Sequence, residues 1–296
     1  KIIQKWIKDG KIGKVGSVDG WTDRPVWPQG NNLSDPDNSK KPEGMDWDLW
    51  VGPEKNNGYI PGLHAFDWRG YWDYGTGSLG DMGCHLMDVP IKALGLYDPY
   101  SVEASISRLP YVRSYTPADV SSSSVPASSI VTYRFNPSKL NDSKVKFTWM
   151  DGGLRPSQPD QIKEDIGVGG ILIYGEKGII SCNDYGTRAK LYIDGEVVET
   201  GNFDGIPSNS FNHYTSWVEA MVDGYGSDKH KNLNSGFDVA GPISEVVLLG
   251  NVAVRSGLLK RSPRSNVFIG RKRLDYDSKN MVITNFDQAN QFLTRE

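Results

Sequence analysis

Six short segments with the composition of β-strands follow one another between residues 101 and 193, and no helical pattern interrupts them. They span residues 101–108, 128–136, 144–150, 171–174, 179–182 and 191–193. Several are rich in β-branched and aromatic residues, and turn residues separate them. A run of strands flanked by helices favours an α+β fold over alternating βαβ units.

Helical patterns lie on both sides of this run. They are predicted at residues 78–94, 210–222, 243–255 and 286–295, and residues 1–13 have the pattern of a helix end. A strand is expected at residues 14–21 and a hairpin at residues 274–285. Pro90 should kink the first of these helices. The apolar side of the helix at 210–222 carries Phe211, Tyr214, Trp217, Val218 and Met221.

Residues 22–74 have no periodicity and are unusually aromatic. They contain Trp27, Trp47, Trp50, Trp68 and Trp72 with Tyr59, Tyr71 and Tyr74. A connection this long is more often functional than structureless. Such rings line pockets for polar ligands, sugars above all, but they also seal loops over a core. The sequence leaves both interpretations open.

Composition excludes several classes of function. The 296 residues carry a net charge of -3, which gives no bulk attraction for nucleic acid or an anionic membrane. No apolar run approaches the roughly 18 residues of a membrane span. Cys84 and Cys182 form neither a disulfide framework nor a zinc motif. The sequons at Asn32 and Asn141 are frequent by chance, and nothing in the sequence addresses the chain to a compartment.

A glycine motif, Gly75-Thr-Gly77-Ser-Leu-Gly80, matches the dinucleotide fingerprint GxGxxG letter for letter. The fingerprint needs a buried apolar strand before it, whereas here the preceding residues are DWRGYWDY. We therefore interpret the match as accidental. The glycines are still expected to let the backbone approach a ligand at the start of the helix, which makes Gly77 a candidate cofactor contact.

The helix that follows places Asp81, His85 and Asp88 at i, i+4 and i+7, hence on one face. A carboxylate one turn from a histidine can orient the imidazole and raise its pKa, as a general base near neutral pH requires. The alternative is a surface histidine with acidic neighbours. A metal site is not expected, because no second histidine lies near in the sequence.

The residues around this helix resemble those of a known family. Residues 68–96, WRGYWDYGTGSLGDMGCHLMDVPIKALGL, resemble the signature helix of the Gfo/Idh/MocA oxidoreductases, the glucose-fructose oxidoreductase and inositol dehydrogenase family. Further matches are KIGKVGSVDGWTDRPVWPQG, DWDLWVGP, WMDGGLRP and ISEVVLLGNVAVRSG, so the resemblance covers nearly the whole chain.

The resemblance implies an α+β domain built on a large, mostly antiparallel open β-sheet with helices packed on one face. In the family's full chain, a Rossmann domain that binds NAD or NADP precedes this domain. Residues 1–13 would then be the remnant of the linking helix, and residues 14–296 the C-terminal substrate-binding and oligomerisation domain. A true phosphate-binding turn and the family's Glu-Lys-Pro segment are both missing, so no cofactor is expected on this chain alone.

The resemblance also assigns roles to residues. Asp81 and His85 would face the nicotinamide, with His85 as the acid/base and Asp81 orienting it. Candidate substrate-binding residues are Trp68, Arg69, Tyr74 and Asp88, and less securely Arg24, Asp151, Arg155 and His213, with His64 as a further histidine near the aromatic segment. An arginine fork suits a carboxylate or a vicinal diol. The alternative for these charged residues is a role in fixing loops through salt bridges.

The sequence leaves three functions open. The first is an NAD(P)-dependent oxidoreductase acting on a sugar, cyclitol or related polyol. The second is an NAD-dependent glycosidase acting by transient oxidation and elimination, which would release an aglycone without accumulating NADH. The third is a non-catalytic domain that forms a homo-oligomer through an apolar open sheet face, and the isolated chain is expected to be inactive.

Overall fold

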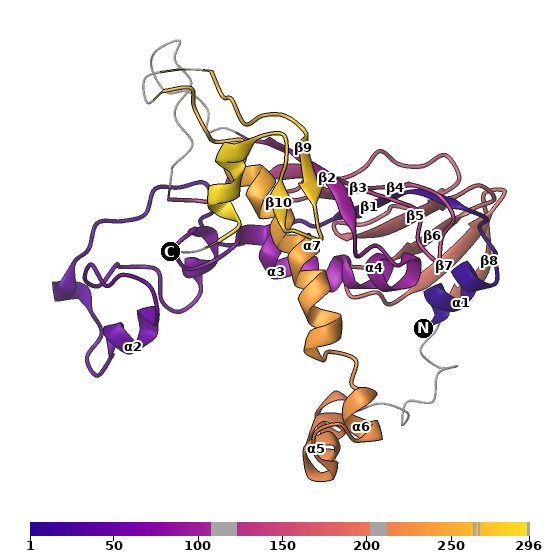
Figure 1. The fold of residues 1–296 in the computed structure, drawn as a ribbon, viewed down its shortest axis with the longest axis horizontal. Coiled ribbons are helices and arrows are strands. Elements are labelled where there is room, and N and C mark those ends of the chain that lie inside the picture. Colours follow the sequence, from indigo (N-terminus) through magenta and orange to yellow (C-terminus); the bar gives the residue numbers. More distant parts are fainter. Residues whose placement is uncertain (108–122, 202–211, 263–264, 266, 295–296) are drawn as a thin grey trace.

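The computed structural model describes residues 1–107, 123–201, 212–262, 265 and 267–294. Within these residues, ten strands form one sheet in the order β10-β9-β2-β3-β4-β1-β5-β6-β7-β8 (Figure 1). The strands are β1 (Val15–Trp21), β2 (Pro99–Ile106), β3 (Ser129–Phe135), β4 (Val145–Met150), β5 (Gly170–Gly175), β6 (Ile179–Cys182), β7 (Ala189–Ile193), β8 (Glu196–Gly201), β9 (Leu274–Asp277) and β10 (Val282–Ile283).

The sheet is almost entirely antiparallel. Only β1 and β4 run parallel, and every other neighbouring pair in the described sheet is antiparallel. β1 reaches the centre of the sheet because it pairs with β4 on one side and with β5 on the other. The predicted fold class is confirmed: a large, mostly antiparallel open sheet in an α+β fold.

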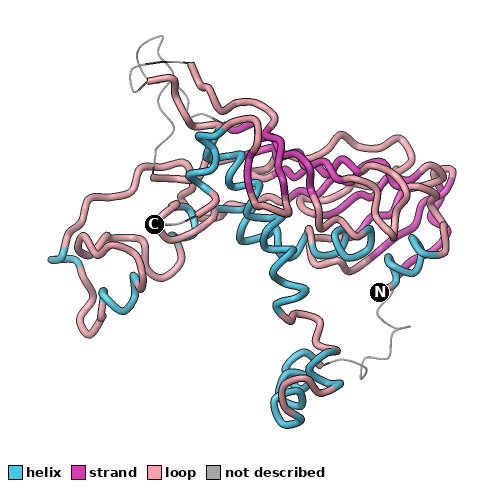
Figure 2. Tube along the Cα trace, in the orientation of Figure 1, coloured by secondary structure: helices cyan, strands magenta, loops and turns pink. Residues whose placement is uncertain are grey.

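Helices cover one face of this sheet. Figure 1 shows α1 (Ile2–Lys8), α3 (Gly77–Leu86), α4 (Asp88–Leu94) and the upper part of α7 (Phe237–Ser256) along the same side, and Figure 2 separates the strand layer from the helices. The short α2 (Trp47–Val51) lies in the aromatic segment. α5 (His213–Asp223) and α6 (Asp228–Lys231) lie at the far end of α7, away from the sheet (Figure 1).

The main core lies between the sheet and these helices. In β3, Val131, Tyr133 and Phe135 alternate with less buried residues and are at most 1% exposed. Tyr133 donates a hydrogen bond to the carbonyl of Val247 in α7 at 3.4 Å. Gly250 makes this contact possible, because a Cβ at that position would lie 2.0 Å from the Tyr133 hydroxyl oxygen.

The opposite face of the sheet is polar at its centre. Asp19, Thr148, Thr132 and Glu103 are successive cross-strand neighbours in β1, β4, β3 and β2, and Glu103 accepts a 2.6 Å hydrogen bond from Arg134. The apolar face that we expected of an oligomerisation surface is therefore not found across these four strands. The homo-oligomer stays a prediction.

The predicted helix at residues 78–94 is two helices. α3 ends at Leu86, Met87 forms the junction, and α4 begins at Asp88. Pro90 lies in the first turn of α4, where the amide that proline lacks would have no intrahelical partner. The break lies in the turn before Pro90, where proline removes the bond to the Leu86 carbonyl, so the predicted kink takes the form of a break between two helices.

Two other helices differ from their sequence patterns. α7 begins at Phe237, six positions before the predicted start at residue 243, and its length and hydropathy would suffice for a membrane span. Half of this apolar stretch of α7 is buried within the fold, as expected of a core helix. In α5, the apolar side is exposed: Tyr214, Trp217, Val218 and Met221 are 81%, 57%, 50% and 63% accessible. Phe211 lies outside the described residues.

The remaining differences are at the ends of elements. β8, which the charged sequence EVVETG did not signal, adds an edge strand beside β7. The predicted C-terminal helix is a 3-10 helix at Asp287–Phe292. The hairpin expected at residues 274–285 is confirmed as β9 and β10.

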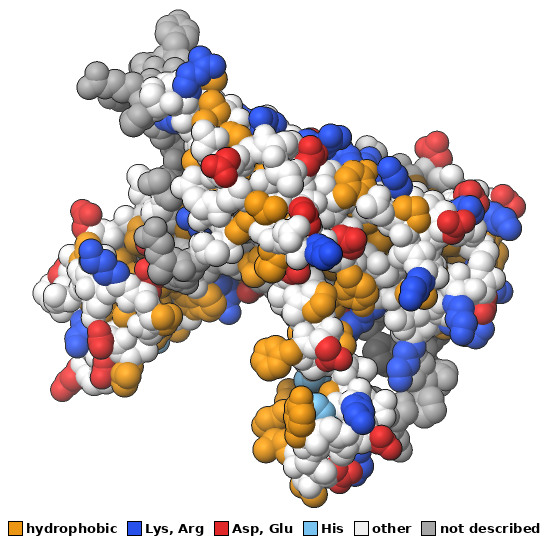
Figure 3. Space-filling model, in the orientation of Figure 1, with side chains coloured by type: hydrophobic (Ala, Val, Ile, Leu, Met, Phe, Trp, Pro, Cys, Tyr) orange, Lys and Arg blue, Asp and Glu red, His pale blue; other side chains and the backbone are white. Residues whose placement is uncertain are grey.

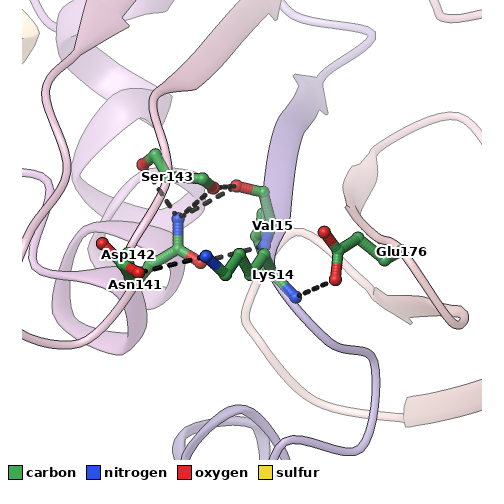
Figure 4. Close-up of polar contacts among 6 residues, drawn as sticks. All are labelled: Lys14, Val15, Asn141, Asp142, Ser143 and Glu176. Carbon is green, nitrogen blue, oxygen red and sulfur yellow. Dashed lines mark hydrogen bonds and ion pairs between the residues drawn. The ribbon is translucent and has the colours of Figure 1, made fainter.

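A side-chain clip fixes the start of β1 (Figure 4). The Asn141 amide nitrogen donates to the Val15 carbonyl at 2.9 Å, and its oxygen accepts from the Val15 amide at 2.9 Å. Ser143 donates to the same carbonyl at 2.5 Å. Asn141 is only 7% exposed. Its amide nitrogen is therefore already bonded inside the fold, which agrees with giving this sequon no weight.

Replacing Asn141 by alanine should destabilise the chain by about 2–3 kcal/mol, because it leaves both backbone groups of Val15 without their side-chain partner in a buried place. Urea unfolding measures the effect. The neighbouring Asp142→Ala is the control, since Asp142 is 85% exposed in its ion pair with Lys14 and should change stability by less than about 0.5 kcal/mol. Equal effects of the two changes would contradict the clip.

Candidate functional site

The N-terminus of α3 is filled by a side chain from the aromatic segment. The Gln29 oxygen accepts from the Ser78 amide at 3.1 Å and from the Trp27 indole at 3.0 Å, while its nitrogen donates to the Pro126 carbonyl at 2.7 Å. Gln29 is 5% exposed. The free amides of a helix start are the groups that would bind a phosphate. Here one of them is bonded within the protein.

The glycine motif before α3 packs against protein. Gly77 has φ +65°, and a Cβ on it would lie 2.5 Å from Val125. A Cβ on Gly75 would lie 2.6 Å from the Arg69 carbonyl oxygen. Sequence reasoning predicted close approach of this backbone, but to a ligand. The structure shows close approach to neighbouring segments, in agreement with an accidental fingerprint.

Asp81 and Arg69, two predicted site residues, are bonded to each other. The Arg69 Nε donates to an Asp81 carboxylate oxygen at 3.1 Å, and both side chains are about a quarter to a third exposed. The guanidinium lies 4.6 Å from the ring centre of Trp68 and 4.5 Å from that of Phe66. This pair ties the face of α3 to the aromatic segment.

His85 lies one turn further along α3 and is exposed. No hydrogen bond joins it to Asp81 among the described contacts, so Asp81 has a different partner from the one that we expected. The His85 ring instead lies 5.2 Å from the ring of Tyr185, in the turn between β6 and β7. Tyr185 was missed by sequence reasoning, because nothing local relates a turn one hundred residues away to α3.

The aromatic segment both seals a small core and lines a cavity. Trp47, Tyr59 and Tyr71 are buried in a small core of their own, and Trp47 stacks on Trp50 with ring centres 4.6 Å apart. Trp50 is only partly buried. Together with Trp68 and Tyr74 it lines a cavity of about 430 Å³, whose other lining residues are Val51, Pro53, Glu54 and Asp73. Trp47, Tyr59 and Tyr71 therefore seal a core, while a ligand role for the rings that line the cavity stays a prediction.

A larger cavity, of about 880 Å³, lies where the glycine turn meets α7 and the C-terminal 3-10 helix. Gly75 and Thr76, at the start of α3, line it together with Asn251 and Arg255 of α7. Its volume is in the range of small-molecule sites. Glu54 and Asp73 line both cavities, which makes them neighbours. No sequence motif pointed to α7 as a pocket wall.

The other predicted site residues have partners elsewhere. Asp88 pairs with Lys92 at 2.8 Å, Arg24 with Asp23 at 3.2 Å and Arg155 with Asp165 at 3.1 Å. His213 begins α5, away from the sheet (Figure 1), and His64 packs its ring edge on Trp50 at 6.1 Å. The structure thus brings together Trp68, Arg69, Tyr74 and Asp81, and a substrate role for each of the predicted site residues stays a prediction.

Asp151 is 1% exposed and accepts three hydrogen bonds. Ser129 donates its amide at 2.5 Å and its hydroxyl at 3.0 Å, and the Trp149 indole donates at 3.0 Å. Burial raises the pKa of Asp151 to about 6, although these hydrogen bonds oppose the rise. Its described partners all belong to the protein. No group of three or more His, Cys, Asp or Glu side chains in the described ranges is placed to hold a metal ion.

Residues 1–107 match the sequence model of an oxidoreductase family, the C-terminal alpha/beta domain of Gfo/Idh/MocA proteins. This range contains Arg69, Asp81 and His85, and it confirms the resemblance seen in residues 68–96. No curated protein matches the chain significantly.

Several solved structures resemble the fold. They include the WlbA dehydrogenase of Bordetella pertussis in complex with NADH and UDP-GlcNAcA (15% identity, TM-score 0.43, 86% of this chain and 58% of that one), the UDP-N-acetylglucosamine 3-dehydrogenase GnnA of Acidithiobacillus ferrooxidans (12%, 0.40, 87% and 61%) and a levoglucosan dehydrogenase complexed with NADH (16%, 0.41, 85% and 58%). The chain spans less than two thirds of the length of each. Likenesses this distant indicate no substrate for it.

The Arg69–Asp81 pair should be energetically coupled. A double-mutant cycle of Arg69→Ala and Asp81→Ala, measured by urea unfolding, should give a coupling of about 1 kcal/mol, because the pair is only partly exposed. The Lys163–Glu196 pair, at 3.0 Å but about three quarters exposed, is the control and should give less than about 0.5 kcal/mol. Equal coupling energies in the two cycles would contradict a stabilising role of the Arg69–Asp81 pair.

Asp151 should make stability depend on pH. Its folded pKa is about 6, above the ordinary value of 3.8 for an aspartate, so the folded state holds the proton more tightly and loses stability as pH rises through this window. The stability of the parent relative to Asp151→Asn should fall by about 2 kcal/mol between about pH 4 and about pH 7. Urea unfolding at both pH values measures it. A difference that does not change with pH would show that the carboxyl titrates normally.

Proposed function

We propose that this chain is the substrate-binding and catalytic-histidine domain of an NAD(P)-dependent oxidoreductase that acts on a sugar, a cyclitol or a related polyol. The observation that carries the proposal is the exposed His85 on α3, in the segment that matches the oxidoreductase family. The first residues of the same helix region line the larger cavity. Aromatic rings and planar polar groups together suit a sugar.

In this proposal His85 acts on the substrate hydroxyl. Its imidazole accepts the hydroxyl proton as the carbon is oxidised, and returns it in the reverse direction. An imidazole suits this step because its ordinary pKa lies near neutrality. Asp81, one turn away and held by Arg69, keeps a carboxylate near the imidazolium that forms. Trp68 is then held in place by the same arginine.

The described residues do not form a cradle for the phosphates of a dinucleotide. Gln29 bonds the start of α3, and Gly75 and Gly77 are packed against protein. We therefore place the hydride acceptor, NAD or NADP, on a separate Rossmann domain of the full protein and derive no step through it here. Gly77 as a direct cofactor contact has no support in this packing.

A second domain is also supported by α5. Its exposed apolar side chains, among them Trp217 and Met221, form a surface that a protein seldom leaves in water. The family match to a C-terminal domain gives the same expectation. Hydrophobic side chains gather on the left of the lobe at the bottom of Figure 3, where Figure 1 places α5. A domain packed there would lie on the helical side of the sheet.

The test is hydride transfer by the full protein. With NAD or NADP and a panel of sugars and cyclitols, NADH or NADPH formation should be measurable by absorbance, and His85→Ala should lower kcat/KM at least about a hundredfold. His230→Ala is the matched control, because His230 lies on the distant α6, and it should leave the rate unchanged.

The outcomes separate the candidate functions. Unchanged turnover in His85→Ala would remove the assignment of the acid/base. Release of a free aglycone from a glycoside without accumulation of reduced cofactor would identify transient oxidation and elimination instead. No turnover with any combination of cofactor and sugar would leave the domain without its proposed reaction.

A further inference from the structure

The His85 imidazole needs an orienting contact that does not come from Asp81. The Asp81 carboxylate accepts its hydrogen bond from Arg69, and the described contacts of the imidazole include no hydrogen bond. His85 is exposed, so its ring can turn about two side-chain torsions unless another group packs against it. A general base has to point at one hydroxyl, and a displacement of about 1 Å can lower a rate about a hundredfold.

The ring that packs against His85 belongs to Tyr185, in the turn between β6 and β7. The two ring centres are 5.2 Å apart and the ring planes are inclined at 61°, an edge-to-face arrangement that aromatic pairs prefer. Tyr185 is 60% exposed, so burial in the core does not account for its position. The contact with the imidazole is therefore the feature of Tyr185 that requires an explanation.

The turn that carries Tyr185 is closed by Asn183. The Asn183 Oδ1 accepts hydrogen bonds from the Tyr185 amide at 3.2 Å, from the Thr187 amide at 2.8 Å and from the Thr187 hydroxyl at 3.0 Å. The Asn183 amide donates to the Thr187 carbonyl at 3.0 Å. Asparagine is favoured in turns because its side chain forms such bonds with the backbone that follows it. The backbone that presents Tyr185 is therefore held from both ends of the turn.

The same turn packs on α4 through Gly186. Gly186 has φ +67°, and a Cβ on it would lie 2.6 Å from a methyl group of Val89, so that only a glycine fits here. Val89 follows His85 by four residues, and Met87 between them keeps a helical φ of -82° and ψ of -22°. Val89 and His85 therefore lie on one side of the helix. The turn contacts that side twice, with Gly186 on Val89 and Tyr185 on His85.

We propose that Tyr185 is the positioning residue of His85. Its ring, presented by the turn at residues 183–187, holds the imidazole in the orientation in which it accepts the hydroxyl proton of the substrate. The inference rests on the proposed function, in which His85 is the acid/base, and no bond to Tyr185 forms or breaks in the reaction. Two residues then share the support of the imidazole, because Tyr185 orients the ring while the Asp81 carboxylate stabilises its charged form.

The orientation of the ring is tested by NMR on the 296-residue chain with isotope-labelled histidine and tyrosine, without cofactor or substrate. The chain has four histidines, and the ring resonances of His85 are assigned by their loss in His85→Ala. A nuclear Overhauser effect between the rings of His85 and Tyr185 is expected in the parent. Gly186→Ala leaves both rings in the sequence but forces the turn away from Val89, so it should abolish this effect.

The matched control is Gly195→Ala, in the turn between β7 and β8. Gly195 has φ +80°, so alanine there meets the same kind of backbone strain, but the atom nearest to its Cβ would be 3.9 Å away. This variant should keep the effect between the two rings. If Gly186→Ala does not fold, Asn183→Ala takes its place, since it removes the side-chain bonds that close the turn. The proposal is overturned if the parent shows no effect between the rings, or if the variant and its control behave alike.

Turnover by the full protein is the second measurement. Tyr185→Ala should lower kcat about tenfold or more and change KM by less than about twofold, because the ring acts on the orientation of the base and not on substrate affinity. Tyr185→Phe keeps the ring and should retain kcat within about twofold of the parent. Normal turnover in Tyr185→Ala, a change in KM alone, or a Tyr185→Phe as slow as Tyr185→Ala would each overturn the proposal.

The two measurements separate the failure of this inference from that of the proposed function. If Gly186→Ala abolishes the contact between the rings but the full protein shows no turnover, the placement of His85 by Tyr185 stands and only the reaction is removed. If His85→Ala is inactive but Tyr185→Ala turns over like the parent, the reaction stands and the positioning role of Tyr185 is removed.

Discussion

The close contact at Gly250 is the constraint on which the arrangement of the helical layer depends. A Cβ there would lie 2.0 Å from the Tyr133 hydroxyl of β3 and 2.6 Å from Leu79 of α3. Only a glycine lets α7 touch the sheet and α3 at the same point. α3 is thereby held along the sheet with His85 exposed to solvent. The next residue of α7, Asn251, is one of the residues that line the larger cavity. The contact at Gly250 therefore determines both the packing of the core and the position of α3.

The fold was predictable where the pattern is local. Strands such as β3 alternate buried and less buried residues, and the α3 face at Asp81 and His85 follows from helix periodicity. The long-range contacts that position the site residues were not predictable from local patterns. Gln29 lies 49 positions before Ser78, and Tyr185 one hundred positions after His85. Such contacts depend on the strand order, which no short-range pattern specifies.

The glycine motif is compatible with two opposite interpretations, close approach of the backbone to a ligand or to another part of the protein. The sequence indicates that the backbone at Gly75 and Gly77 approaches something closely, and the structure agrees. What it approaches is the protein itself, because the segment that returns through Val125 and the Gln29 side chain occupy the space in which a pyrophosphate would lie. Asn251 is the converse case. Its place in the apolar helix α7 reads as packing, yet its amide atoms remain without partners in the described chain.

We propose that the substrate hydroxyl that is oxidised lies against His85 on the exposed face of α3. A crystal structure of the full protein with cofactor and a bound sugar tests it most directly. We predict sugar density on the exposed face of α3, with the hydroxyl of the oxidised carbon about 3 Å from an imidazole nitrogen of His85. A sugar bound with His85 out of reach of every hydroxyl would contradict it.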